Sequence, residues 1–385
     1  METKLCQEIM FKAAKKHIII AKLFEFGGSN SHLKALIKYL GKENIILLLE
    51  NEDQLPYLKN LGDTTGIIVK IQQQLHGYAH LGNNFTTNIR ELFKILKSVF
   101  AIQLLSFKYS YASVTICSVE PEKHLYLLWL PWGKVYYILH STPNKNHTPF
   151  TSYTCNTNLS KRKRIITVSQ SNKQLICENW DIANKEKFVN VIYNCLLNDN
   201  LNHVKTQTTK SNNQQHIVTM GHVINYKNPH VWLDVAKLVT LKYSNAIFIW
   251  LGDGPLLKEF KDATKMLDNI RFEGYKADTD MYLKSACIYY QPSLQETHGI
   301  AVVEAMANQL PCVTSNAGGL PESVQHQFNG LLLNAMDKQG QANAILTLLN
   351  DPNLSKQYGI NGYLKYNELF SYESFKLNMD ALYIS

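Results

Sequence analysis

The segment Ser293–Glu322 reads SLQETHGIAVVEAMANQLPCVTSNAGGLPE, and its pattern decides the fold class. The apolar run ACIYYQPS that leads into it predicts a strand, GIAVVEAMANQL predicts a helix, and PCVTSN predicts the next strand. Strands that alternate with helices in this way are typical of parallel sheets covered by helices on both faces. The segment also carries two acids eight positions apart, Glu296 and Glu304, and a glycine doublet that begins at Gly318.

The same alternation runs through the rest of the chain and divides it into two halves. The run HIIIAKLF predicts a strand, followed by a glycine turn, an amphipathic helix and the strand NIILLLE. The second half restarts with the strand HIVTMG, a helix over VWLDVAKLV and the strand AIFIWLGDG. Between the halves, the polar stretch Val204–Gln215 predicts a linker. A length of 385 residues also favours two domains.

The cysteines and the apolar runs indicate the compartment. Seven cysteines are scattered without a CxxC pair, which argues against a disulfide framework or a zinc site and fits a reducing environment. The N-terminus lacks an apolar run followed by a cleavage site, and no apolar run approaches the roughly 20 residues of a membrane span. We therefore expect a cytoplasmic protein.

The basic residues are concentrated in the first half of the chain. Residues 1–205 contain 25 Lys and Arg against 15 Asp and Glu, whereas residues 206–385 contain 14 against 16. The commoner explanation is a solvated lysine-rich surface. The more specific explanation is attraction to an anionic membrane surface, on the inner face of the cytoplasmic membrane. The basic residues are not clustered with aromatic ones and no nucleic-acid motif is present, so we expect no nucleic-acid partner.

The acids of the opening segment flank a predicted helix start. Gly299 lies where free backbone N–H groups and the helix dipole favour anions. Glu296 lies in the loop just before this point, and Glu304 is about a turn and a half inside the helix. A carboxylate can accept two hydrogen bonds from a sugar diol. Two isolated acids would be interpreted as an ordinary first-turn residue and a surface residue. The surrounding sequence pattern therefore has to decide whether they bind a sugar.

That pattern resembles the retaining glycosyltransferases of family 4, which have the GT-B fold. The family motif P-S-x-x-E-x-x-G-x-x-x-x-E-A-x-A is matched by PSLQETHGIAVVEAMA, and its later G-G-x-x-E by GGLPE. The segments LGDGPLLKEF and NGLLL also follow the family in the expected order. The resemblance is dense from about residue 165 to 335 and looser before that.

In the first half, two segments resemble parts of the family's active site. The strand KVYYILH ends at His140, the position of the family's active-site histidine; its simpler interpretation is a hydrogen-bonded residue at a strand end. The pair Gly27–Gly28, followed by His32, resembles the family's early glycine loop, although such a pair is often only a tight turn.

One segment departs from the family. TMGHVINYKNP stands where the family has G-R-x-x-x-x-K, whose Arg and Lys clamp the donor diphosphate. Lys227 keeps the lysine, but His222 replaces the arginine and lacks its permanently charged, two-pronged guanidinium. Three interpretations stay open: His222 is a weaker, pH-sensitive phosphate contact, Lys227 and helix dipoles carry the charge alone, or His222 has no ligand.

The resemblance implies an α/β protein of the GT-B fold, with two Rossmann-like domains whose parallel sheets face a central cleft. Residues 1–207 would bind the acceptor, residues 208–368 the nucleotide sugar, and a helix at about 369–385 would pack back on the first domain. The implied catalytic residues are His140, Lys227 and Glu296, and the implied donor-binding residues are Gly28, His222, Lys227, Glu296, Gly299, Ile300, Ala301 and Glu304.

The implied reaction moves a hexose from a nucleotide-diphosphate sugar to a hydroxyl of a glycan or lipid-linked acceptor, with retained anomeric configuration. Its setting would be the synthesis of a bacterial surface polysaccharide such as lipopolysaccharide. No Asp-x-Asp motif lies beside a buried strand, so we expect no metal and no cofactor besides the donor. Two alternatives stay open. One is another enzyme on this fold, such as a nucleotide-sugar epimerase or an inverting transferase. The other is a non-catalytic nucleotide-sugar-binding subunit, which is made plausible by His222 and by Cys195, since the segment VIYN resembles the family's I-x-N-G and Cys195 stands where glycine is usual.

Overall fold

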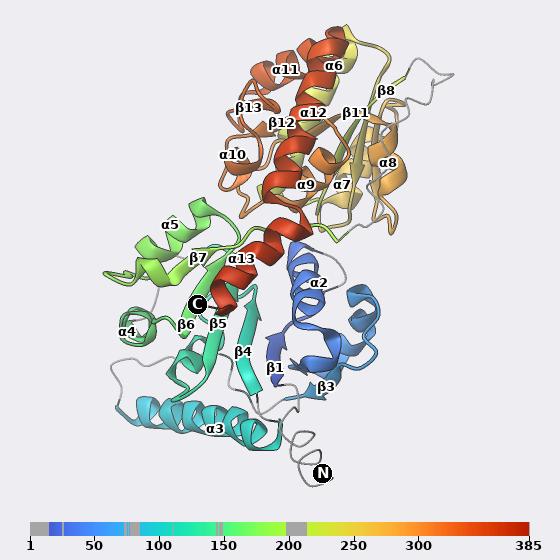
Figure 1. The fold of residues 1–385 in the computed structure, drawn as a ribbon. Helices are drawn as coiled ribbons and strands as arrows, with labels where there is room; N and C mark the ends of the chain where they lie inside the picture. Colours follow the sequence, from blue (N-terminus) through green and yellow to red (C-terminus); the bar gives the residue numbers. More distant parts are fainter. Residues whose placement is uncertain are drawn as a thin grey trace, which may run out of the picture. The chain divides into compact units, whose positions relative to one another are not determined.

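The structure is a computed structural model, and it consists of two compact α/β units (Figure 1). The first unit comprises Met1–Ile192 and Met379–Ser385, and the second comprises Tyr193–Asn378. The residues that the structure describes are 15–24, 27–72, 75, 77, 85–109, 111–143, 145, 149–197 and 214–384.

A seven-stranded parallel sheet forms the centre of the first unit, with strand order β3-β2-β1-β4-β5-β6-β7. Its inner strands are apolar runs such as IILLL, all buried, as expected where both faces of a parallel sheet are covered. The order reverses between β1 and β4, which makes the carboxyl ends of these two strands the topological switch point. The strands are β1 (Lys16–Ala21), β2 (Ile45–Leu49), β3 (Ile68–Ile71), β4 (Tyr111–Ser118), β5 (Lys134–Leu139), β6 (Lys163–Thr167) and β7 (Val189–Val191).

Helices connect these strands, and the end of the chain adds a further one. Tyr383 stacks on Tyr136 of β5 with ring centroids 4.2 Å apart, and its hydroxyl lies 3.1 Å from Oγ1 of Thr115 on β4. These contacts explain why Met379–Ser385 belong to the first unit. The helical segments of this part are α2 (Gly28–Leu40), η1 (Lys42–Asn44), η2 (Glu52–Leu61), α3 (Phe85–Tyr109), η3 (Leu125–Trp129), α4 (Pro149–Asn158), α5 (Gln170–Asn179), η4 (Glu186–Phe188) and the end of α13 (Tyr372–Ile384).

The second unit is built on a six-stranded parallel sheet with strand order β10-β9-β8-β11-β12-β13. Alternate residues of β9 enter two different cores: Phe248 and Trp250 belong to one, and Ile247 and Ile249 to the other. The strand order reverses between β8 and β11, so these strands mark the switch point of this sheet. The strands are β8 (Gln215–Met220), β9 (Ala246–Leu251), β10 (Ile270–Gly274), β11 (Ala286–Gln291), β12 (Cys312–Ser315) and β13 (Gly330–Leu333).

Each core of the second unit lies between its sheet and a different set of helices. Trp232 of α6 packs against Phe248 and Trp250 on one face, whereas Val302 and Met306 of α9 pack with the other core. The helical segments are η5 (Asn225–Lys227), α6 (Pro229–Lys242), α7 (Leu257–Thr264), α8 (Asp280–Ser285), α9 (Ile300–Ala307), α10 (Leu320–Ser323), α11 (Lys338–Asn350), α12 (Pro352–Leu369) and the start of α13.

The division between the units falls earlier in the chain than the expected boundary at 207/208. The cause is that Tyr193 and Leu196 already pack in a core of the second unit, where the Tyr193 ring lies 5.1 Å from that of Phe370. Most of the expected linker Val204–Gln215 lies outside the described residues, and Gln215 is already the first residue of β8.

Candidate functional site

Lys227 and Glu296 meet at the switch point of the second sheet. Lys227 follows β8 and Glu296 follows β11, and the Nζ of Lys227 pairs with Oε1 of Glu296. The side chains are only 14% and 9% exposed. Open α/β sheets bind ligands outside the carboxyl ends of their strands at such a reversal. The structure therefore brings together two residues that the sequence had predicted for separate roles in one site.

Two further polar side chains hold the Glu296 carboxylate, and the sequence pattern did not single them out. Gln291 Nε2 donates to Glu296 Oε1 at 2.5 Å, and Ser293 Oγ donates to the same oxygen at 3.1 Å. Both residues are buried. A polar glutamine at the end of the apolar strand ACIYYQ was the signal that could have revealed the first of them, because a buried amide needs a partner.

The glycine doublet fixes the backbone on the other side of Glu296. The N–H of Gly319 donates to the carbonyl oxygen of Glu296 at 3.0 Å. Gly318 has φ +54°, and a Cβ there would lie 1.8 Å from that same oxygen. Only glycine allows this approach of one loop to the other, which explains why the doublet follows the two acids.

Gly299 is the N-cap residue of helix α9 and has a left-handed conformation, with φ +88°. A Cβ at this residue would lie 2.7 Å from Cδ2 of Leu320. The helix has no side-chain cap and no acid in its first turn, so the backbone N–H groups of Ile300 and Ala301 lack the usual competitors for an anion. The predicted anion-binding amides thus belong to a helix without a side-chain cap that begins four residues after Glu296.

Glu304 lies on α9, one turn inside its start, and is half-buried. Its charge reaches the phenol of Tyr289, whose pKa is raised well above its usual value by burial and then by the negative charges of Glu296 and Glu304. The Tyr289 hydroxyl in turn lies 2.8 Å from Oε1 of Gln291. The negative charges of both predicted acids therefore act on one buried tyrosine.

His222 lies in the loop after β8 and is half-buried. Burial lowers its pKa, the charge of Lys227 lowers it further, and Asp253 only partly opposes them. At neutral pH the imidazole is consequently uncharged. This lowered pKa weakens His222 as a cationic phosphate contact and favours the interpretation in which Lys227 carries the positive charge of this loop.

Glycines bring the loops after β8 and β9 into close contact. A Cβ at Gly252 would lie 2.0 Å from the carbonyl oxygen of Gly221, and one at Gly254 would lie 2.6 Å from that of Val223. The N–H of Val223 donates to the carbonyl oxygen of Asp253 at 2.9 Å. The GDG of the second half therefore supports the loop that carries His222.

His298 and Glu322 mark a second set of contacts that the sequence pattern did not assign. The buried ring of His298 packs against those of Tyr193 and Phe370, with centroid distances of 5.4 and 5.3 Å. Glu322, the acid of GGLPE, accepts a hydrogen bond from the Tyr193 hydroxyl at 2.9 Å. Since His298 directly precedes Gly299, these contacts fix the entry to α9.

In the first unit, the two predicted histidines meet each other. The rings of His32 on α2 and His140 after β5 lie edge to face with centroids 4.9 Å apart. Both ring nitrogens of His140 are buried and have no hydrogen-bond partner among the described residues. Burial lowers the pKa of His140 well below its usual value, and His32 lowers it further. Gly28 is the first residue of α2, which follows Gly27 at φ +137°.

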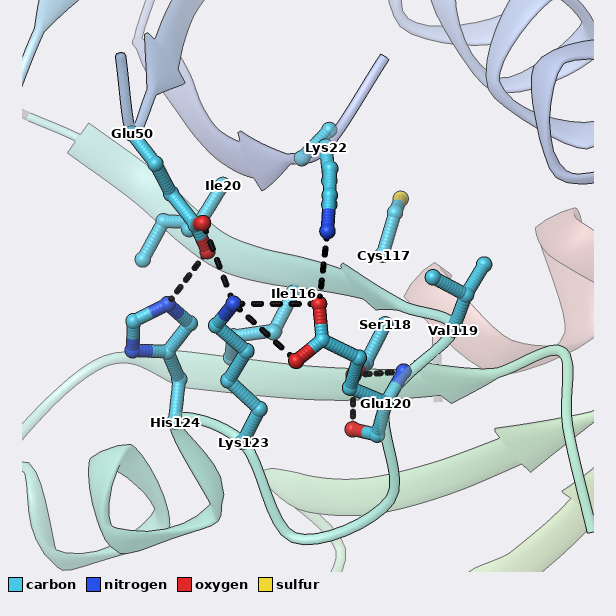
Figure 2. A pocket seen from close by; sticks show the side chains of 11 residues that line it. Ile20, Lys22, Glu50, Ile116, Cys117, Ser118, Val119, Glu120, Lys123 and His124 are labelled. Atoms are coloured by element: carbon cyan, nitrogen blue, oxygen red, sulfur yellow. Dashed lines mark hydrogen bonds and ion pairs between the residues drawn. The ribbon is translucent and has the colours of Figure 1, made fainter. Parts of the chain in front are cut away.

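A charged cluster occupies the switch point of the first sheet, and the sequence did not predict it (Figure 2). Lys123 Nζ lies 3.0 Å from Glu50 and 3.2 Å from Glu120, Lys22 pairs with Glu120 at 2.9 Å, and His124 Nε2 lies 3.3 Å from Glu50. Burial would raise the pKa of Glu50, but the hydrogen bonds from His124 and Lys123 outweigh it and lower the pKa. The cavity between these side chains holds about 10 Å³, which is room for one water molecule.

Two Rossmann-like domains with these strand orders in one chain define the GT-B class of folds. Residues 183–365 match the family of glycosyl transferases group 1. This stretch makes up most of the second unit, which therefore contains a domain of the group 1 glycosyl transferases.

Relatives of known activity match the chain over part of their length. A Bacillus anthracis N-acetyl-alpha-D-glucosaminyl L-malate synthase is 25% identical over 56% of this chain and 58% of its own. An Escherichia coli UDP-Gal:alpha-D-GlcNAc-diphosphoundecaprenol alpha-1,3-galactosyltransferase is 28% identical over 34% of this chain and 36% of its own. The chain therefore spans less than two thirds of the curated relatives it matches.

A solved structure matches the fold along nearly the whole chain. The crystal structure of Anabaena HepE in complex with UDP and glucose superimposes with a TM-score of 0.72, covering 96% of this chain and all of that one, at 16% identity. At this identity the match concerns the fold.

Proposed function

We propose that the chain is a retaining glycosyltransferase that moves a hexose from a UDP-sugar to a hydroxyl of a glycan or lipid-linked acceptor. The observation that carries this proposal is the Lys227–Glu296 pair beside the uncapped start of α9. Its position, at the switch point of a sheet in a group 1 glycosyl transferase domain, is where a nucleotide diphosphate fits. The choice of UDP is supported by the HepE complex and the name of the Escherichia coli relative.

In the proposed complex, the donor diphosphate binds the N–H groups of Ile300 and Ala301 and the ammonium of Lys227. Glu296 accepts hydrogen bonds from sugar hydroxyls, and Glu304 accepts them from the ribose diol. Because Lys227 and Glu296 are paired, the phosphate-binding ammonium and the hydroxyl-binding carboxylate lie side by side. The group that enters thus needs both a negative charge and hydroxyl donors, which a nucleotide sugar has.

The proposed reaction breaks the bond between the anomeric carbon and the β-phosphate oxygen and forms one to the acceptor oxygen. The acceptor hydroxyl attacks on the face that the phosphate leaves, and its proton passes to the leaving phosphate. Lys227 and the amides after Gly299 stabilise the negative charge that develops on that phosphate. His140 contacts the transferred sugar as a neutral hydrogen-bonding group, which its lowered pKa favours.

The proposed acceptor class follows from the relatives. The Escherichia coli enzyme is named for a diphosphoundecaprenol-linked acceptor, and a Staphylococcus aureus relative, the protein CapJ, is 33% identical over 35% of this chain. We therefore place the reaction in the synthesis of a bacterial surface polysaccharide, with the acceptor linked to a lipid or a glycan.

The test combines donor binding with turnover by the purified chain. A thermal-shift screen with UDP-, GDP-, ADP- and CMP-sugars should give its largest rise in Tm with a UDP-sugar, because a ligand that binds the folded state stabilises it. Calorimetry on Glu304→Ala should then show a donor Kd raised about tenfold or more, with turnover at saturation less affected.

Product analysis separates the proposal from its alternatives. Retained anomeric configuration by NMR supports a retaining transferase, and inversion would contradict it. Donor binding without turnover would instead indicate a non-catalytic subunit, and an epimerised donor would indicate an epimerase.

A further inference from the structure

Helix α3 belongs to the first unit (Figure 1). It carries buried side chains on one face and exposed apolar side chains on the opposite face. Its inner face holds the buried residues Glu91, Ile95, Ser98 and Ile102, spaced three or four apart. Helix geometry of 3.6 residues per turn places a second row on the opposite side. This outer row, which we call the α3 stripe, consists of Ile89, Leu92, Phe93, Leu96, Phe100 and Leu104.

The α3 stripe is exposed. Phe93 is 70% and Phe100 62% exposed, and the other four residues are between 39% and 54% exposed. Phe93, Leu96 and Phe100, together with Pro131, line an open apolar hollow of about 610 Å³. The residue after Pro131, Trp132, is 58% exposed. A contiguous apolar surface with aromatic side chains of this size marks an interaction surface rather than a scatter of ordinary exposed residues.

One border of the α3 stripe is basic. Arg90, Lys94, Lys97 and Lys108 lie along the same side of the helix by their spacing, and Glu91 is the one acid in the sequence of α3. Glu91 is buried and paired with Lys94 at 2.8 Å, so it offers no negative charge to a partner. A second copy docking on the stripe would bring no acid from α3 to these basic residues, whereas an anionic bilayer provides an apolar interior and phosphates together.

We propose that the α3 stripe docks on the surface of an anionic lipid bilayer. The helix lies in the interface, with Phe93 and Phe100 among the acyl chains and the lysines beside the headgroup phosphates. Trp132 lies at the level where indole rings are favoured, between the apolar and the hydrated layers. Among the described residues, no helix is both long and apolar enough to cross a bilayer.

The experiment is co-sedimentation of the full chain with vesicles, and it needs neither donor nor turnover. Failure of the docking proposal is therefore distinguishable from failure of the proposed function. The wild-type chain should bind vesicles that contain equal shares of phosphatidylcholine and phosphatidylglycerol. It should bind phosphatidylcholine vesicles at least about tenfold more weakly, and salt should weaken the binding to the anionic vesicles.

The matched variants distinguish binding through the α3 stripe from non-specific adsorption to vesicles. Phe93→Ser/Phe100→Ser should lower the partition coefficient on anionic vesicles by about tenfold or more, and Lys97→Glu should lower it too. Leu241→Ser/Met266→Ser, which changes two side chains of the second unit that are 84% and 90% exposed, should leave it unchanged. Far-ultraviolet circular dichroism checks that each variant folds, which the exposure of the substituted side chains favours.

Three outcomes would overturn the proposal. Equal weak binding of the wild type to both kinds of vesicle would remove the anionic surface as the partner. Unchanged vesicle binding by Phe93→Ser/Phe100→Ser would remove the stripe as the contact. Light scattering that shows a wild-type dimer and a monomeric Phe93→Ser/Phe100→Ser, with vesicle binding the same in both, would assign the stripe to self-association.

Discussion

Lys227 and Glu296 are 69 positions apart in the chain, yet the ammonium of one contacts the carboxylate of the other. Each follows one of the two strands between which the order of the second sheet reverses. The pair is nearly buried and shares its carboxylate oxygen with Gln291 and Ser293. Contacts within the protein consequently hold this carboxylate in one position, which is the preorganisation that binding and catalysis require.

Substitution of one partner of this pair should affect both stability and activity. Glu296→Gln leaves the Lys227 charge without its counterion, so we expect a loss of roughly 2–3 kcal/mol in the free energy of unfolding. Turnover should fall by about 100-fold or more, because the lysine is no longer held beside the donor. Denaturant unfolding and transfer assays measure the two effects.

The control is an exposed ion pair in the same unit. Asp234 and Lys338 lie 2.7 Å apart, with side chains 44% and 47% exposed. Asp234→Asn should change the free energy of unfolding by less than about 1 kcal/mol and leave turnover unchanged. An equal loss of stability in the two variants would contradict the special position of the buried pair.

A methyl group at Gly318 should disrupt the loop beside Glu296. The Cβ of Gly318→Ala would lie 1.8 Å from the Glu296 carbonyl oxygen, on a residue with φ +54°, so we expect a loss of roughly 3 kcal/mol. Gly274→Ala is the control, since φ is +78° there but the nearest atoms lie at 3.5 and 3.7 Å. Gly274→Ala should lower the free energy of unfolding by only roughly 1–2 kcal/mol, through backbone strain. Equal Tm values for the two variants would show that the loops carrying Glu296 and Gly318 can move apart without a loss of stability.

The buried His140 predicts a pH dependence of stability. Its pKa is lowered well below 6.5 in the folded chain, so below that value the unfolded state binds a proton that the folded state does not. The contribution of His140 to the free energy of unfolding is therefore fully present above about pH 6.5. It is lost as the pH falls, by at most about 1.4 kcal/mol per pH unit. His140→Gln should flatten the decline of unfolding free energy between pH 6.5 and 5. His326→Gln, at an exposed residue, is the control. Identical slopes of unfolding free energy against pH in the wild type and His140→Gln would refute the assignment of the pH dependence to His140.

Removal of divalent metal should leave turnover unchanged. We expect Lys227 and the first amides of α9 to stabilise the leaving diphosphate without a metal ion. In the part of the chain that the structure describes, no three His, Cys, Asp or Glu side chains are grouped so that they could hold one. Transfer assays with and without a chelator check this expectation. A loss of turnover that added Mg²⁺ or Mn²⁺ restores would show that the donor enters with a metal.

Much of the fold could be predicted from local patterns. Apolar runs such as AIFIWL became buried strands and the glycine turns lie where the sequence placed them, because burial on both faces leaves a continuous apolar signature. Helix α3 was not predicted, since apolar residues on two opposite faces hide the single-sided period that identifies an amphipathic helix. The division after Ile192 depends on Tyr193 and Leu196, which pack with residues distant in the chain, and no local pattern encodes such contacts.

By itself, the sequence determined the motif Glu296–Gly299–Glu304, the lysine at 227, the histidines at 32 and 140 and the parallel α/β class. These are local features, in which residue type and spacing act within one strand, turn or helix. Only the tertiary structure decided that Lys227 pairs with Glu296, that His32 meets His140 and that Lys123 joins Glu50 to Glu120. The reason is that strand order within a parallel sheet, which no local period encodes, determines which loops meet at its carboxyl edge.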